Sequence, residues 1–379
     1  MYLPSIVLFA IMDNDRFLIY SSALVIMGLS NAVIPILPEL SATGQIYGIN
    51  SSSLVYSSFF LGALSTMLPF GILSDRTDNL KLVSLGLLLS FISGLCMIFT
   101  DSFIIFVSAR FIEGAACGAF FPAAYSRLAR YTKRARYMGE FSFLINAGLA
   151  AGVAVTGYLV HSNIKNGIIL FSILTFLTII FAIYRSIVSS NTIATITSQK
   201  KIIEREHPSS HIFTSKDTRG IWIISFILAG SSGVLISLYP EYGTDTLSKT
   251  ELGISISLLY VSTMISSLVT SYVNIGYAKL IKIGIMIATI GILVTINSSM
   301  AGFFIIGIGS GLMLVGLPIA IASMNIEKGM AMGIYNTCIY AGLALMPLIA
   351  GVLANSLEVK TIFFITAILF GLTIFLNRD

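Results

Sequence analysis

Apolar runs of about 20 residues recur along the whole chain, and they limit its fold more than any other feature. A helix rises about 1.5 Å per residue, so a run of this length crosses about 30 Å of hydrocarbon. The runs are too long for the alternating strands of about ten residues that build membrane barrels. We predict membrane spans at residues 17–38, 50–72, 81–100, 103–125, 138–160, 167–187, 219–240, 252–275, 280–298, 301–323, 330–354 and 361–377.

Composition supports this interpretation. Of the 379 residues, 56% are hydrophobic and only 10% are charged, whereas soluble domains carry charge on about a quarter of their residues. Most of the surface must therefore face lipid, and the predicted fold is an all-α membrane protein with twelve transmembrane helices. Residues 1–12 are apolar but lack a basic start and a small-residue cleavage site, so we expect an interfacial lead-in rather than a signal peptide.

The basic residues predict the orientation. Counting spans places only Lys165, Lys249 and Lys360 on one side, and the other Lys and Arg residues outside the spans on the opposite side. Basic loops stay in the cytoplasm, so we expect a multi-pass protein of the plasma (cytoplasmic) membrane with both termini cytoplasmic. The net charge of +5 lies in these loops and does not indicate a nucleic-acid partner. Loop clusters such as Arg127 and Arg130 are expected to contact anionic lipid headgroups.

Two halves of six spans each are expected. Residues 188–218 are polar and contain Pro208, which predicts a cytoplasmic linker between an N-terminal bundle at 1–187 and a C-terminal bundle at 219–379.

The halves also resemble each other in sequence. GLSNAVIPILPEL at 28–40 aligns with GSSGVLISLYPEY at 230–242, and AGLA occurs at both 147–150 and 341–344. The second alignment also pairs Gly139 with Gly333 and Gly157 with Gly351. Parallel repeats of this kind imply a pseudo-two-fold axis along the membrane normal and a site near the midplane.

A short motif follows the second span: Gly71, Leu73, Ser74, Asp75 and Arg76 occur in GILSDR. It resembles the loop motif of the major facilitator superfamily, which implies two pseudo-symmetric six-helix bundles that rock around a central site. The resemblance also implies a cytoplasmic gate at Gly71, Asp75 and Arg76, with the acid latched onto the start of the eleventh span. The later positions depart from the family pattern, with Asp78 and Asn79 in place of Gly and Arg.

The fourth span carries a buried charge pair. Arg110 and Glu113 lie one turn apart on the same helix face, in RFIEGAACG at 110–118. The run resembles the Arg-x-x-Gln-Gly motif of drug/proton antiporters. Charges inside a bilayer persist mainly when they are paired or used, so we predict that Arg110 and Glu113 couple proton binding to transport. A static ion pair that fixes helix packing is the alternative.

Small and amide residues complete the candidate site. Gly114 with Gly118, and Gly148 with Gly152, have the spacing that lets membrane helices approach closely. Asn31, Asn146 and Asn336 fall in spans that line the cavity of the resembled family, and buried amides need partners. They are either substrate contacts or interhelical clamps. Glu39 and Glu241 are expected simply to mark where their helices leave the membrane.

The predicted function is proton-coupled efflux of a small amphipathic compound or metabolite by a monomeric secondary transporter. Uptake of a sugar or organic anion, by facilitated diffusion or symport, is the alternative within transport. A membrane sensor that transports nothing is the alternative from another class. The expected partners are the substrate, protons and membrane lipids. The sequence shows no nucleophile–base set, phosphate loop or metal cluster, so neither an enzyme, a cofactor nor a metal is expected.

Overall fold

The computed structural model describes residues 3–41, 50–131, 134–193, 216–273, 275–323 and 328–376, and the regular secondary structure of these residues is helical throughout. The N-terminal helices are α1 (Leu3–Ala32), η1 (Ile34–Ile36), α2 (Leu37–Ser41), α3 (Ser51–Ser74), α4 (Asn79–Phe99), α5 (Phe103–Leu128), α6 (Arg134–Leu159) and α7 (Asn166–Ile193). The C-terminal helices are α8 (Lys216–Tyr242), α9 (Lys249–Ser271), α10 (Tyr277–Thr295), α11 (Ser299–Ser323), α12 (Lys328–Leu353), α13 (Val359–Leu372) and η3 (Thr373–Leu376).

Twelve helical segments in the described residues are long and apolar enough to cross a membrane, and they match the predicted spans one for one. The first span differs in detail. Its helix already begins at Leu3, so the apolar start of the chain continues α1 instead of forming a separate lead-in. The helix then ends at Ala32 and passes through η1 into α2, because Pro35 and Pro38 cannot donate helical hydrogen bonds. Most of the predicted linker lies outside the described residues.

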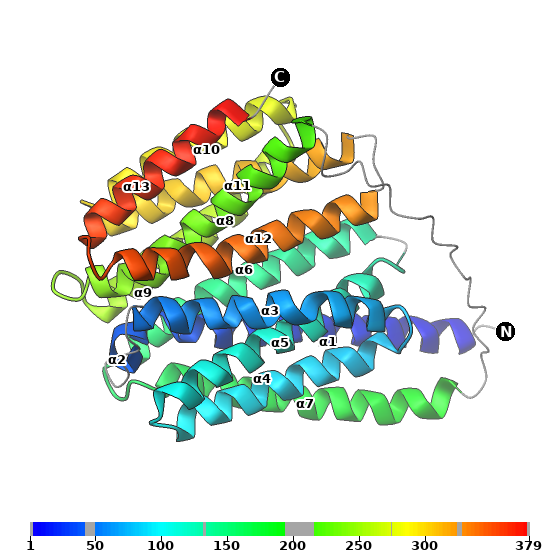
Figure 1. The fold of residues 1–379 in the computed structure, drawn as a ribbon. Helices are drawn as coiled ribbons and strands as arrows, with labels where there is room; N and C mark the ends of the chain where they lie inside the picture. Colours follow the sequence, from blue (N-terminus) through cyan, green and yellow to red (C-terminus); the bar gives the residue numbers. More distant parts are fainter. Residues whose placement is uncertain are drawn as a thin grey trace.

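The helices pack into two bundles, one of α1 to α7 and one of α8 to α13 (Figure 1). Helix pairs recur between the bundles: α3 packs on α5 as α9 packs on α11, and α1 packs on α6 as α8 packs on α12. The bundles meet through two equivalent pairs, α6 with α9 and α12 with α3. The two halves that resemble each other in sequence thus also pack their helices in the same pairs.

One pair of contacts shows the repeat at atomic scale. A side chain at Gly148 would meet the carbonyl oxygen of Leu24 at 2.6 Å, and one at Gly342 would meet the carbonyl oxygen of Phe226. The AGLA match pairs Gly148 with Gly342, and the alignment of 28–40 with 230–242, extended four residues toward the N-terminus, pairs Leu24 with Phe226. Both α6 and α12 therefore need glycine where they cross the first helix of their own bundle.

The two ends of the molecule differ in charge. We call the end with the α3–α4 and α5–α6 connections, which carry Arg76 and Arg130, the basic end. We call the opposite end, where α3 and α9 begin at Ser51 and Lys249, the far end.

Candidate functional site

A cavity of about 830 Å³ lies between the two bundles. It extends from the middle of the molecule to the basic end and takes residues from both bundles. Its lining includes Asn31, Tyr56, Phe59, Phe60, Asp75, Arg110, Cys117, Tyr125, Asn146, Tyr260, Ser310, Asn336 and Tyr340. A space of this size, largely apolar with a few polar groups, is typical of a small-molecule site.

The closed end of the cavity lies near the middle of the molecule. There Asn31 is buried and donates a hydrogen bond to the carbonyl oxygen of Leu149 at 3.1 Å, which joins α1 to α6. Tyr260 from the opposite bundle also lines the cavity. Asn31 therefore has the geometry of a clamp while also lining the cavity.

The other two predicted amides lie nearer the open end. Asn146 donates to the carbonyl oxygen of Ser142 on its own helix at 2.9 Å. Asn336 is exposed to the cavity near the start of α12. The structure thus brings all three amides to one cavity, at different depths.

The predicted gate motif borders the mouth of the cavity at the basic end. Gly71 and Asp75 line it, and Asp75 ends α3 while Arg76 is exposed beyond it. The side chains at the start of α12, where the resemblance places the latch partner, lie outside the described residues.

The two residues that depart from the family motif have local structural roles. The carboxylate of Asp78 accepts a hydrogen bond from the backbone N–H of Leu80 at 3.1 Å, and so caps the start of α4. The amide of Asn79 donates to the hydroxyl of Ser126 at 3.0 Å, which joins α4 to α5. Helix N-termini favour such caps because their first N–H groups lack helical partners.

Arg110 and Glu113 form an ion pair in the interior of the N-terminal bundle. Their side chains are 3% and 0% exposed, and Nη1 of Arg110 donates to Oε2 of Glu113. The guanidinium lies 4.8 Å from the centre of the Phe59 ring. Arg110 belongs to the cavity lining, whereas Glu113 does not. Of the pair, Arg110 thus borders the cavity, and Glu113 reaches it through its contact with Arg110.

Other titratable groups surround this pair. Cys117 follows Glu113 by one turn on α5 and lines the cavity with Arg110. Tyr56 from α3, Tyr260 from α9 and Tyr340 from α12 line the same cavity. Arg110 therefore borders a space to which both bundles contribute hydroxyl groups.

The predicted packing glycines lie at close helix crossings within the N-terminal bundle. A side chain at Gly114 would meet the backbone of Phe59 on α3, and one at Gly118 would meet Thr66. Gly148 and Gly152 press in the same way against α1. The first crossing fixes the position of the Arg110 turn against the aromatic residues of α3.

The far end is closed by contacts between the bundles. Nζ of Lys249 lies 2.6 Å from the Glu39 carboxylate, and Nδ2 of Asn50 donates to the Glu241 carboxylate at 2.6 Å. Thr250 donates to the carbonyl oxygen of Gly157 at 3.1 Å. Glu39 and Glu241, which are equivalent in the repeat, each reach the helix start of the opposite bundle. They do more than mark the ends of their helices.

One buried cluster was missed by the sequence analysis. Asp15 is 1% exposed, and its two carboxylate oxygens pair with Arg127 at 2.5 Å and with Arg185 at 2.6 Å. This cluster ties α1, α5 and α7 together at the basic end. Arg127 is thus part of an internal ion pair, not only of a headgroup-facing loop. The apolar start of the chain was the available signal, because a longer first helix places Asp15 inside the bundle.

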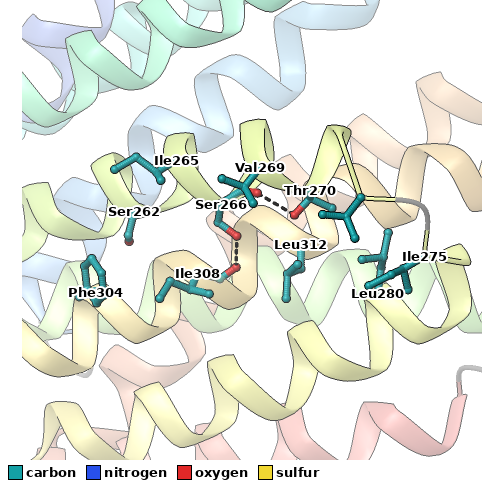
Figure 2. A pocket seen from close by; sticks show the side chains of 11 residues that line it. Ser262, Ile265, Ser266, Val269, Thr270, Ile275, Leu280, Phe304, Ile308 and Leu312 are labelled. Atoms are coloured by element: carbon teal, nitrogen blue, oxygen red, sulfur yellow. Dashed lines mark hydrogen bonds between the residues drawn. The ribbon is translucent and has the colours of Figure 1, made fainter.

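A second hollow, of about 330 Å³, is formed only by residues of α9, α10, α11 and the α9–α10 connection (Figure 2). Its hydroxyls are already used, since Ser266 donates to the carbonyl oxygen of Ile308 at 2.8 Å and Thr270 to that of Ser266 at 2.6 Å. Ile265 and Val269 at its rim are 54% and 58% exposed. This hollow therefore lies on the lipid-facing surface and not between the bundles.

Comparisons with known proteins agree with the architecture. A Methanocaldococcus jannaschii protein, described as the uncharacterized MFS-type transporter MJ1560, is 25% identical over 357 residues, which cover 88% of this chain and 90% of the relative. A mutant of the nucleoside transporter NupG superposes with a TM-score of 0.76 at 12% identity and covers 95% of this chain and 98% of its own. A bacterial homologue of the human lysosomal transporter Spinster gives 0.66 at 13% identity, with coverages of 97% and 94%.

The family model described as Major Facilitator Superfamily matches residues 18–216 and 221–378, nearly the whole chain. Together with the twelve membrane-length helices and the paired bundles, this match identifies a multi-pass membrane transporter and not an enzyme. The chain belongs to the Major Facilitator Superfamily.

Proposed function

We propose that this protein exports a small amphipathic compound in exchange for protons, with Arg110 and Glu113 as the coupling pair. The observation that carries the proposal is the arrangement of this pair: Arg110 lines the cavity, and the Glu113 carboxylate, which is not part of the lining, is paired with its guanidinium. Binding of a proton at Glu113 and binding of substrate in the cavity therefore both affect the Arg110 side chain.

The coupling follows from electrostatics. While Glu113 is charged, it holds Arg110 against the helix and leaves the cavity free. When Glu113 binds a proton, Arg110 loses its partner, and an uncompensated buried charge costs about 3–5 kcal/mol. Its nearest polar surroundings are then in the cavity, where it competes with the substrate. A substrate that occupies the cavity returns Arg110 to Glu113 and favours release of the proton.

The proposal includes the orientation. With the basic end cytoplasmic, as the distribution of Lys and Arg predicts, the cavity opens to the cytoplasm of a plasma-membrane protein with both termini inside. Residues 188–218 then form a cytoplasmic linker between the bundles 1–187 and 219–379. In this proposal the structure is the inward-facing state of a monomeric exporter, in which the cavity can bind substrate from the cytoplasm.

The test is flux in proteoliposomes under an imposed pH gradient. Once a substrate is identified, the unmodified protein should accumulate it on the acidic side, whereas Glu113→Gln should only equilibrate it. Glu113→Asp is the matched variant that keeps an ionisable group. Movement of substrate with the protons would indicate symport, and indifference to the gradient would indicate facilitated diffusion. Unchanged proton dependence in Glu113→Gln would refute the coupling role.

A further inference from the structure

The central cavity has an uneven distribution of chemistry. At its closed end Tyr56 and Phe60 have ring centres 4.9 Å apart, Phe59 and Phe60 4.8 Å apart, and Phe60 and Tyr340 6.3 Å apart. We call Tyr56, Phe59, Phe60 and Tyr340 the aromatic band. Three of these residues come from α3 and one from α12, so the band spans both bundles. Rings in such arrangements accept another ring edge-on or in offset stacking.

A positive charge borders the aromatic band. The Arg110 guanidinium already lies over the Phe59 ring, so this face of the band is occupied by a cation. The described lining of the cavity contains a single carboxylate, that of Asp75, which lies at the mouth on the basic end. A cationic solute would therefore meet the guanidinium at the closed end, and the lining offers it no carboxylate there.

An anionic solute meets the opposite difficulty. It would draw Arg110 away from Glu113, whose other oxygen, Oε1, is buried without a hydrogen-bond partner in the described part of the chain. Removing one member of a buried pair leaves the other charge uncompensated. The closed end is thus unfavourable for an anion as long as Glu113 is charged.

A neutral polar group does find a partner. The hydroxyl of Ser310 on α11 lines the cavity, is buried, and has no hydrogen-bond partner among the described residues. Buried hydroxyls favour a hydrogen-bond partner over none. A hydroxyl or carbonyl group on a solute would supply one.

From these contacts we infer that the cargo is an uncharged molecule with an aromatic ring, seated on the aromatic band, and a hydroxyl or carbonyl group that reaches Ser310. This inference rests on the transport function proposed above and narrows its substrate class. An uncharged cargo also favours proton release, as antiport requires. It keeps Arg110 paired with Glu113, whereas an anion would compete with Glu113 for the guanidinium.

The test uses a matched set of probes with the purified full-length protein in detergent. Naphthylethanol, naphthylacetate and naphthylethylammonium share one ring and differ in charge, and decalylethanol replaces the aromatic ring by a saturated one. Binding of each is measured by calorimetry at neutral pH. We expect naphthylethanol to bind at least about tenfold more tightly than the other three. Tightest binding of the acetate or the ammonium probe, or equal binding of all four, would overturn the inference.

Variants assign the effect to the residues. Phe60→Leu should weaken naphthylethanol about tenfold and leave decalylethanol unchanged, and Ser310→Ala should weaken both alcohols. Phe304→Leu, in the lipid-facing hollow, is the matched control and should change neither. The double variant Arg110→Gln with Glu113→Gln removes both charges together and should abolish the discrimination against the ammonium probe. A double variant that still rejects this probe would show that Arg110 is not the cause.

The ranking of the probe affinities is measured without a pH gradient. The antiport mechanism and the substrate class can therefore be refuted independently of each other. Loss of proton coupling with the same order of probes would refute the antiport mechanism alone. Intact coupling with a charged probe bound most tightly would refute the substrate class alone.

Discussion

The two ends of the bundle interface use the same kind of residue in opposite ways. At the far end, side chains at Gly157 and Gly351 would meet the opposite bundle, at 2.5 Å from the Lys249 carbonyl oxygen and 2.7 Å from the Ser53 Cβ. At the basic end, side chains at Gly139 and Gly333 would meet no described residue within 4 Å. At the bundle interface, helices α6 and α12 thus each place a packed glycine at the far end and an open glycine at the basic end, about 27 Å apart.

This difference suggests how the cavity could open to one end of the molecule and then to the other. Gly139 and Gly333 are equivalent in the repeat, as are Gly157 and Gly351. Glycine costs helix stability and is favoured in membrane helices where a backbone must approach closely. The open glycines therefore indicate surfaces that come together when the basic end closes and the far end opens. Contacts between the bundles must break in that movement, whereas contacts within a bundle persist.

The largest expected effect concerns a contact that persists. Asp15→Asn leaves Arg127 and Arg185 without their carboxylate inside the N-terminal bundle, and should lower the free energy of unfolding by about 3–5 kcal/mol. Chemical unfolding in detergent measures it. Arg136→Gln, which breaks a pair with Glu140 in the same bundle and changes a side chain that is 69% exposed, is the control and should cost at most about 1 kcal/mol. Equal losses for both variants would contradict the distinction.

The next effect separates the packed glycines from the open ones. Gly157→Leu overpacks the closed far end by about 1–3 kcal/mol, which should shift the population toward the far-end-open state roughly 5- to 150-fold. Gly139→Leu should be tolerated in the present state and should block closure of the basic end. Both variants should slow transport while trapping opposite states.

Cysteine accessibility distinguishes these two variants. In a background with Cys96, Cys117 and Cys338 replaced by Ala, we would label Asn336→Cys at the basic end and Ser53→Cys, which is buried where α3 meets α12 at the far end, with an impermeant maleimide. Gly157→Leu should raise labelling at the far end, and Gly139→Leu should raise it at the basic end. The same labelling pattern in both variants would contradict the proposal that one end closes when the other opens.

The smallest effect concerns the polar closure of the far end. Glu39→Gln removes the ion pair with Lys249, whose side chain is 19% exposed while that of Glu39 is 33% exposed. Partly solvated pairs contribute little, so far-end labelling should rise at most about fivefold. Asp101→Asn breaks the pair with Lys165 at the same end but within one bundle, and should leave labelling unchanged. A larger effect from Asp101→Asn would contradict the importance of crossing between bundles.

Much of the fold could be predicted from the sequence because a bilayer leaves few choices. Twelve apolar runs had to become twelve helices, and the repeated Pro38 and Glu39, with Pro240 and Glu241, revealed the two bundles. The predicted pairing of Arg110 with Glu113 also follows from helix spacing alone.

Contacts between distant segments could not be predicted in the same way. Asp15 and Arg185 lie 170 positions apart, and Glu241 and Asn50 lie 191 apart. No periodicity in the sequence connects them, because their proximity depends on how whole helices pack. Whether Glu113 faces the cavity directly or through Arg110 likewise depends on the rotation of α5 against α3, which is set by Gly114 and Gly118.

The pairing of Glu113 with the cavity-lining Arg110 has a consequence for energy conservation in the proposed antiport mechanism. In that mechanism, a proton that moves from the empty cavity to the carboxylate approaches the paired guanidinium, and like charges repel strongly in a medium of low dielectric constant. The empty transporter would therefore resist a leak of protons across its membrane. Arg110 would limit proton entry while the cavity is empty and would move only when cargo or a proton displaces it from Glu113.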